Sequence, residues 1–138
     1  MITTMIKICM MKASLMYNID QTLIETIIKI ESNYDVNARS STNDHGLMQL
    51  NKKKIYDICQ NIKVGTEMLQ QCKNKYENKL GDAWIVCYNR GVHATKKLTK
   101  EKARRTKYYN KFKENYVPNK VYDMFKIREL DQQLSVGF

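Results

Sequence analysis

Proline and glycine are scarce in this sequence. Pro occurs once and Gly five times in 138 residues, which leaves few residues for the many tight turns of an all-β fold. Stretches rich in Leu, Ile, Met, Lys and Glu instead favour helices. We therefore expect a mainly α-helical protein.

Long hydrophobic runs are also missing. No stretch approaches the roughly 18 apolar residues of a membrane-spanning helix, so we expect no membrane span. Residues 1–17 are apolar, but Lys7 and Lys12 interrupt them and no small-residue cleavage site follows, so we interpret them as part of the folded domain rather than as a signal peptide. The length predicts one domain over residues 1–138, in which residues 119–138 form an additional C-terminal helix or tail.

Metal-binding patterns are lacking. The four cysteines are Cys9, Cys59, Cys72 and Cys87. Without a C-x-x-C pair they argue against a zinc knuckle or a thioredoxin-type site, and His45 and His93 lack metal-ligand spacing. We predict neither a metal site nor a cofactor. Composition alone leaves two alternatives open for the cysteines, namely two disulfides or four reduced core side chains.

Acidic residues are fewer than basic residues. The formal net charge is +10, and such a surface attracts polyanions such as nucleic acid, anionic lipid or bacterial cell wall. Residues 96–113 contain nine Lys or Arg against Glu101 alone. This stretch predicts a docking surface for a polyanion, and a solvated helix surface is the alternative.

Apolar residues recur at intervals of three and four in several segments, as on one face of a helix. The predicted helices cover residues 2–17, 20–31, 52–58, 61 to about 78, 83–88 and the region 108–116. Asp20 and Asp82 are predicted N-caps. Residues 32–44 are rich in Ser, Asn, Asp and Thr and predict a loop.

Glu31 continues the apolar stripe of Ile24, Ile27 and Ile28 on the second helix. Its carboxyl is therefore predicted to face the core or a cleft. Desolvation raises the pKa of a carboxyl, as a general acid near neutral pH requires. The pattern alone leaves open that Glu31, at the helix end, turns to solvent.

An ordered series of short motifs surrounds Glu31. It consists of Glu31-Ser32, Tyr34, Ala38, Ser40, Gly46-Leu47-Met48-Gln49, Asn61, Gly65, Tyr88-Asn89 and Gly91. The series resembles the lytic transglycosylase domain family, over roughly residues 6–116. Within that family the chain looks most similar to the small secretion- and conjugation-associated enzymes. The resemblance implies a lysozyme-like helical domain of the goose-type or transglycosylase kind.

The resemblance also implies an activity. It is non-hydrolytic cleavage of the β-1,4 bond between N-acetylmuramic acid and N-acetylglucosamine, leaving a 1,6-anhydro end, with Glu31 as acid and then base. The substrate-binding residues that it implies are Ser32, Met48, Gln49, Tyr88, Asn89 and Tyr108. A Cys9–Cys59 disulfide and an extracytoplasmic location follow from the same resemblance. Two antiparallel helices on either side of the turn near residues 78–81 would set Cys72 opposite Cys87, which allows a second bridge that is not part of the resemblance.

Three positions depart from the family pattern. Arg104 stands where the family often has Glu, Asn43 where it has Gly, and Arg90 where it has a small residue. The expected partners are peptidoglycan glycan strands, with secretion, conjugation or phage machinery as further possibilities. We expect a monomer and no specific nucleic acid.

Three alternatives stay open. The first is a hydrolytic lysozyme in which Asp35 or Asp44 assists Glu31. The second is a basic helical nucleic-acid-binding protein that uses residues 96–113. The third is a cell-wall-binding protein on an inactive enzyme scaffold.

Overall fold

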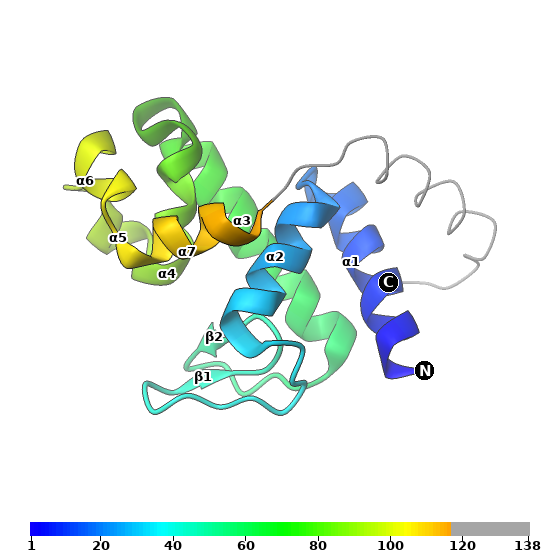
Figure 1. Cartoon of the computed structure of the whole chain (residues 1–138). Coiled ribbons are helices and arrows are strands. Elements are labelled where there is room, and N and C mark those ends of the chain that lie inside the picture. Colours follow the sequence, from blue (N-terminus) through cyan, green and yellow to red (C-terminus); the bar gives the residue numbers. More distant parts are fainter. Residues whose placement is uncertain (117–138) are drawn as a thin grey trace.

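Helices make up most of the computed structural model, which describes residues 1–116 (Figure 1). The helices are α1 (Ile2–Tyr17), α2 (Gln21–Ser32), α3 (Ile58–Leu80), the 3₁₀ helix η1 (Gly81–Ile85), α4 (Val86–Arg90), α5 (Val92–Thr95), α6 (Lys100–Arg104) and α7 (Lys107–Asn115). The strands are β1 (Asp44–His45) and β2 (Leu50–Asn51). The predicted mainly α class is confirmed. The predicted C-terminal helix or tail lies outside the described residues.

The long helix α3 runs through the middle of the molecule. It packs against α1 and η1. Figure 1 shows α2 crossing in front of it, with α4 to α7 gathered at one end. Two disulfides fasten these helices, since Cys9 of α1 is joined to Cys59 and Cys72 to Cys87 of α4. No helix within residues 1–116 has the length and hydropathy needed to cross a bilayer.

Helix starts follow side-chain caps. Asp20 caps α2 as predicted, because its carboxylate accepts a hydrogen bond from the Thr22 amide at 3.1 Å. Asp57 caps α3 in the same way, accepting from the amide of Gln60 at 2.9 Å. The third helix therefore begins at Ile58, three residues before the predicted start at Asn61.

The brief helix predicted over residues 52–58 is wrong. Residues 53–57 have no regular secondary structure. The side chain of Asn61 holds this part of the chain in place, because its Nδ2 donates to the carbonyls of Ile55 at 2.7 Å and His45 at 3.0 Å, while its Oδ1 accepts from the Met48 amide at 2.8 Å. A buried amide that satisfies three backbone groups outweighs the local helix propensity.

Residues 33–52 form an irregular segment below α2 in Figure 1. Its strands β1 and β2 pair antiparallel, with Asp44 opposite Asn51 and His45 opposite Leu50. They were not predicted, because two-residue strands show no alternation of apolar residues. Gly46, at φ 77°, joins them where an added Cβ would lie 2.2 Å from Asn61 Nδ2.

Left-handed backbone is concentrated in the same segment. Among the described residues, the non-glycine residues with positive φ are Asn18, Asn33, Tyr34, Asn43, Gln49 and Lys52. All but Asn18 fall between residues 33 and 52. Asn33 directly follows α2 and reverses the chain just after Glu31.

The buried helix predicted over residues 83–88 is divided. All six residues are buried, as expected, but they are shared between η1 and α4. Asp82 is not the N-cap, because Leu80 holds that position. The carboxylate of Asp82 instead accepts from the Tyr109 hydroxyl at 3.0 Å and from Lys113 Nζ at 3.2 Å, so it links η1 to α7.

Candidate active site

Glu31 lies in the last turn of α2, half-buried, with its carboxyl facing α7. The hydroxyl of Tyr108, the second residue of α7, donates to Glu31 Oε2 at 2.8 Å. Burial raises the pKa of Glu31 to about 7, and the charge of Asp44 adds to this, while the Tyr108 hydrogen bond and the charge of Lys111 act in the opposite direction. At neutral pH this carboxyl therefore exists in both protonation states.

A cleft of about 530 Å³ opens at Glu31. Its lining residues are Glu31, Thr42, Asp44, Gln49, Asn51, Met68, Tyr88, Asn89, Arg90 and Gly91. One wall comes from the β1–β2 segment and the other from the end of α4. The structure thus brings four predicted site residues, Glu31, Gln49, Tyr88 and Asn89, to one cavity.

Tyr88 links the two walls of the cleft. Its side chain is 8% exposed, and its hydroxyl donates to the carbonyl of Met48 at 2.5 Å. Burial, together with the charges of Glu31 and Asp44, raises the pKa of Tyr88 well above its ordinary value. The phenol therefore stays protonated and keeps the cleft walls at a fixed separation.

Gln49 reaches the cleft from the turn between the strands. Its Nε2 donates to the carbonyls of Gly46 at 3.0 Å and Ala38 at 3.2 Å. Both amide protons are thereby used within the protein. Its Oε1 is left to accept a hydrogen bond from a ligand.

Met48 and Ser32 do not line the cleft, contrary to expectation. Met48 is fully buried, and its side chain packs so closely on α3 that a Cβ added at Gly65 would lie 2.5 Å from its Sδ. Ser32 Oγ donates to the Ile28 carbonyl at 3.1 Å, in the preceding turn of its own helix. Both residues therefore lie behind the cleft wall and support it, and neither forms part of the cleft surface.

Tyr108 is also absent from the lining, since its hydroxyl is directed to Glu31. Burial and the charge of Glu31 raise its pKa well above the ordinary value, so the phenol remains a donor.

Arg104, at the position of the expected Glu, lies outside the lining too. Its Nε approaches the Tyr109 hydroxyl at 3.5 Å.

The two loop aspartates differ in position. Asp44 lines the cleft, whereas Asp35 is exposed and accepts from the Asn37 amide. Burial raises the pKa of Asp44, but hydrogen bonds from Thr42, Ser40 and Asn51 and the charge of His45 outweigh it, so its pKa is lowered. The cleft therefore holds one ionised carboxylate beside one protonatable carboxyl.

Some lining residues were missed by the sequence interpretation. Thr42 and Asn51 donate to Asp44 from opposite sides of the hairpin, and Met68 comes from α3. They stand in no motif, and only the packing of distant segments brings them to the cleft. Lys111 belongs to the basic stretch 96–113, and its charge lowers the pKa of Glu31.

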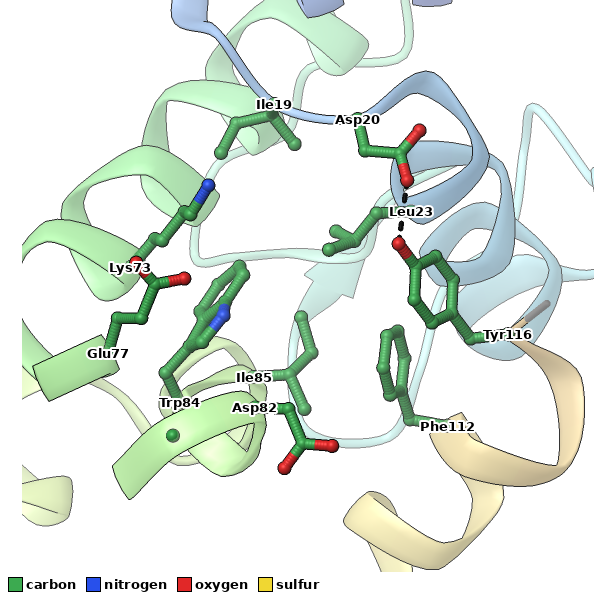
Figure 2. A pocket seen from close by; sticks show the side chains of 11 residues that line it. Ile19, Asp20, Leu23, Lys73, Glu77, Asp82, Trp84, Ile85, Phe112 and Tyr116 are labelled. Atoms are coloured by element: carbon green, nitrogen blue, oxygen red, sulfur yellow. Dashed lines mark hydrogen bonds between the residues drawn. The ribbon is translucent and has the colours of Figure 1, made fainter. Parts of the chain in front are cut away.

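A second, smaller cavity of about 300 Å³ lies elsewhere (Figure 2). At its rim Tyr116 donates to Asp20 at 2.6 Å and stacks on Phe112, with 4.8 Å between the ring centroids. None of the site residues predicted from the sequence lines it. Nowhere in residues 1–116 do three His, Cys, Asp or Glu side chains come together as a metal site would need.

The helical architecture is that of a lysozyme-like domain, and its cleft contains the protonatable carboxyl of Glu31. The chain belongs to the Transglycosylase SLT domain family, whose model matches residues 8–111. The matched region includes Glu31, Tyr108 and every residue that lines the cleft. No solved structure matches the chain.

Proposed function

We propose that this protein is a lytic transglycosylase that cleaves the β-1,4 bond between N-acetylmuramic acid and N-acetylglucosamine in peptidoglycan. The observation that carries the proposal is Glu31, a carboxyl in the cleft with its pKa raised to about 7. Membership of the family supports the substrate class. A group that is half-protonated at neutral pH can donate a proton and later accept one.

The proposed reaction uses Glu31 twice. The carboxyl first gives its proton to the glycosidic oxygen, as the bond from C1 of muramic acid to that oxygen breaks. The carboxylate then removes the proton of the muramic acid C6 hydroxyl, whose oxygen bonds to C1. The products are a free N-acetylglucosamine end and a 1,6-anhydromuramic acid end, and Glu31 regains its proton without water.

Neighbouring side chains have distinct roles in this proposal. Tyr108 orients the carboxyl through its hydrogen bond to Oε2, and Tyr88 keeps the walls apart. Gln49 Oε1 and the Asn89 amide supply hydrogen-bonding groups for sugar hydroxyls or acetamides. Ser32 and Met48 act by packing and backbone support rather than by substrate contact.

Asp44 supports a second candidate function, a hydrolytic muramidase. It lines the same cleft as Glu31 and its pKa is lowered, so it is ionised when Glu31 is protonated. Two such carboxyls are what a glycosidase needs to activate water or stabilise charge. Against this, Ser40, Thr42 and Asn51 already donate to the Asp44 carboxylate, which favours a role in shaping the hairpin.

Product analysis separates these functions. Purified protein is incubated with peptidoglycan and the muropeptides are examined by mass spectrometry. We expect anhydro ends from the wild type and from Glu67→Gln, an exposed control on α3, and at least a roughly hundredfold lower rate from Glu31→Gln. Hydrated reducing ends would instead establish hydrolysis, and binding without any product would mean an inactive scaffold.

The setting of the activity is part of the proposal. Two disulfides fit an oxidising, extracytoplasmic compartment. The similarity to secretion- and conjugation-associated enzymes, the association with such machinery or with a phage, and the monomeric state stay predictions. Tight, salt-sensitive binding of DNA by residues 96–113 would instead support the nucleic-acid alternative.

A further inference from the structure

Arg90 has no partner inside the part of the protein that the structure describes. It is the last residue of α4, is exposed, and lines the cleft. Among the described lining residues it is the only Lys or Arg. Its guanidinium forms no hydrogen bond or ion pair within residues 1–116.

The space beside Arg90 is open. Gly91, also in the lining, has φ 95° and ψ 153°, so the chain turns sharply away after α4. A Cβ added at Gly91 would meet no atom within 4 Å. The rim at Arg90 therefore has room for a substituent that projects from a bound sugar chain.

A guanidinium is unnecessary for binding the sugar rings themselves. Hydroxyl and acetamide groups are neutral, and Gln49, Asn51 and Asn89 already offer neutral partners in the cleft. Guanidinium groups pair best with carboxylates, which they can bind through two parallel hydrogen bonds. In peptidoglycan the carboxylates lie off the rings, on the peptide attached to the lactyl group of muramic acid.

We propose that Arg90 binds a carboxylate of the peptide stem, so that the protein selects peptide-bearing over peptide-free glycan strands. This inference rests on the proposed function, because it places muramic acid in the cleft at Glu31. The negative charge of Asp44 in the same cleft repels such a carboxylate. Attraction to Arg90 and repulsion from Asp44 together determine where along the cleft the peptide stem can lie.

The test compares two substrates and two arginines. Peptidoglycan strands are used intact, or after an amidase has removed the peptides and the lactyl carboxylates that this hydrolysis frees have been capped as methylamides, and kcat/KM is measured on each. For Arg90→Ala we expect the ratio of intact to stripped substrate to fall about tenfold, mainly through KM. Arg39→Ala is the matched control, since Arg39 is exposed and lies outside both the cleft lining and the basic stretch 96–113.

A ratio of intact to stripped substrate that does not change in Arg90→Ala, whether or not the activity on both substrates falls, would overturn the inference. Binding is measured separately on the Glu31→Gln background, with muramyl disaccharides that carry the peptide or carry a methylamide in its place on the lactyl group. If the peptide strengthens binding only when Arg90 is present, the inference stands even where no cleavage is seen. If both substrates are cleaved equally well, the proposed function stands and the inference fails.

Discussion

At the scale of single residues, two carboxyls in one cleft have their pKa values moved in opposite directions. Burial raises the pKa of Glu31, while hydrogen bonds and the nearby His45 charge lower that of Asp44 despite its burial. Separating two acids in this way leaves one able to transfer a proton near neutral pH and the other charged. The assignment comes from their surroundings, because the two side chains have nearly the same intrinsic acidity.

The Tyr108 hydroxyl tunes the acid. Its hydrogen bond lowers the pKa of Glu31, so Tyr108→Phe should raise that pKa above about 7. Because the acid must be protonated to donate, the alkaline limb of the pH–rate profile should move to higher pH. We expect kcat to fall by roughly tenfold as well, since the carboxyl loses its fixed orientation.

Tyr109→Phe provides the control for this measurement. Tyr109 also donates to a carboxylate, but to Asp82 between η1 and α7, at 3.0 Å. Its loss should reduce stability and leave the alkaline limb in place. An alkaline limb that stays still, or moves to lower pH, in Tyr108→Phe would contradict the assigned role.

The sequence identified those site residues that can be recognised from the pattern of residues near them in the chain. The apolar stripe of α2 placed Glu31, and the family motif placed Gln49, Tyr88 and Asn89 at the cleft. It misplaced Met48, because a motif does not show which of its members packs inward. The side chain of Met48 is buried against Gly65, and only its backbone takes part in the network with Tyr88.

At the scale of elements, the long helices and α7 were predictable, and the shorter helices were not. Helices α1 and α2 have a clear apolar periodicity, and the predicted Asp20 cap is present. The segment before α3 was predicted as helix because its composition allows one. Its actual conformation depends on Asn61, whose three backbone partners lie 6 to 16 residues earlier in the chain.

The Cys72–Cys87 disulfide connects α3 to α4 one residue before Tyr88. It closes a loop of 15 residues, so removing it as Cys72→Ser with Cys87→Ser should cost about 3 kcal/mol of unfolding free energy. Because α4 carries one wall of the cleft, activity should fall as well. Urea denaturation and turnover of peptidoglycan measure the two effects.

The other disulfide serves as the comparison. Cys9–Cys59 joins α1 to α3, away from the cleft lining. The Cys9→Ser, Cys59→Ser variant should lose stability but keep more of its activity at temperatures where it remains folded. Equal losses of activity in both variants would show that α4 is not specifically loosened.

At the scale of the whole molecule, the half-buried carboxyl of Glu31 makes folding dependent on pH. The folded pKa of Glu31, about 7, lies above its ordinary 4.5. Its contribution to stability is therefore fully present below about pH 4.5 and is lost as the pH rises through 7. Ionisation at pH 8 opposes folding by up to about 3 kcal/mol.

Glu31→Gln removes this penalty because the amide does not ionise. The variant should be about as stable as the wild type at pH 4 and more stable at pH 8, by as much as about 3 kcal/mol. Urea denaturation at the two pH values tests this, with Glu67→Gln as the exposed control. A variant that gains nothing at pH 8 would show that the carboxyl is solvated in the folded protein.

The residues with left-handed backbone between 33 and 52 lower the stability of the folded protein. Tyr34, Gln49 and Lys52 have φ of 67°, 51° and 60°, where a side chain costs on the order of 1 kcal/mol each. Lys52→Gly should therefore stabilise the protein, and Lys53→Gly, at a residue without positive φ, should destabilise it. If both variants lose unfolding free energy, the backbone at Lys52 is not strained.

Gln49 carries the same strain inside the cleft. A glycine there would relieve it and yet remove the amide that fixes Ala38 and Gly46. The sequence of this segment is therefore not the one that would make the protein most stable. Under the proposed function, we expect variants that relax this backbone to gain stability and to lose activity.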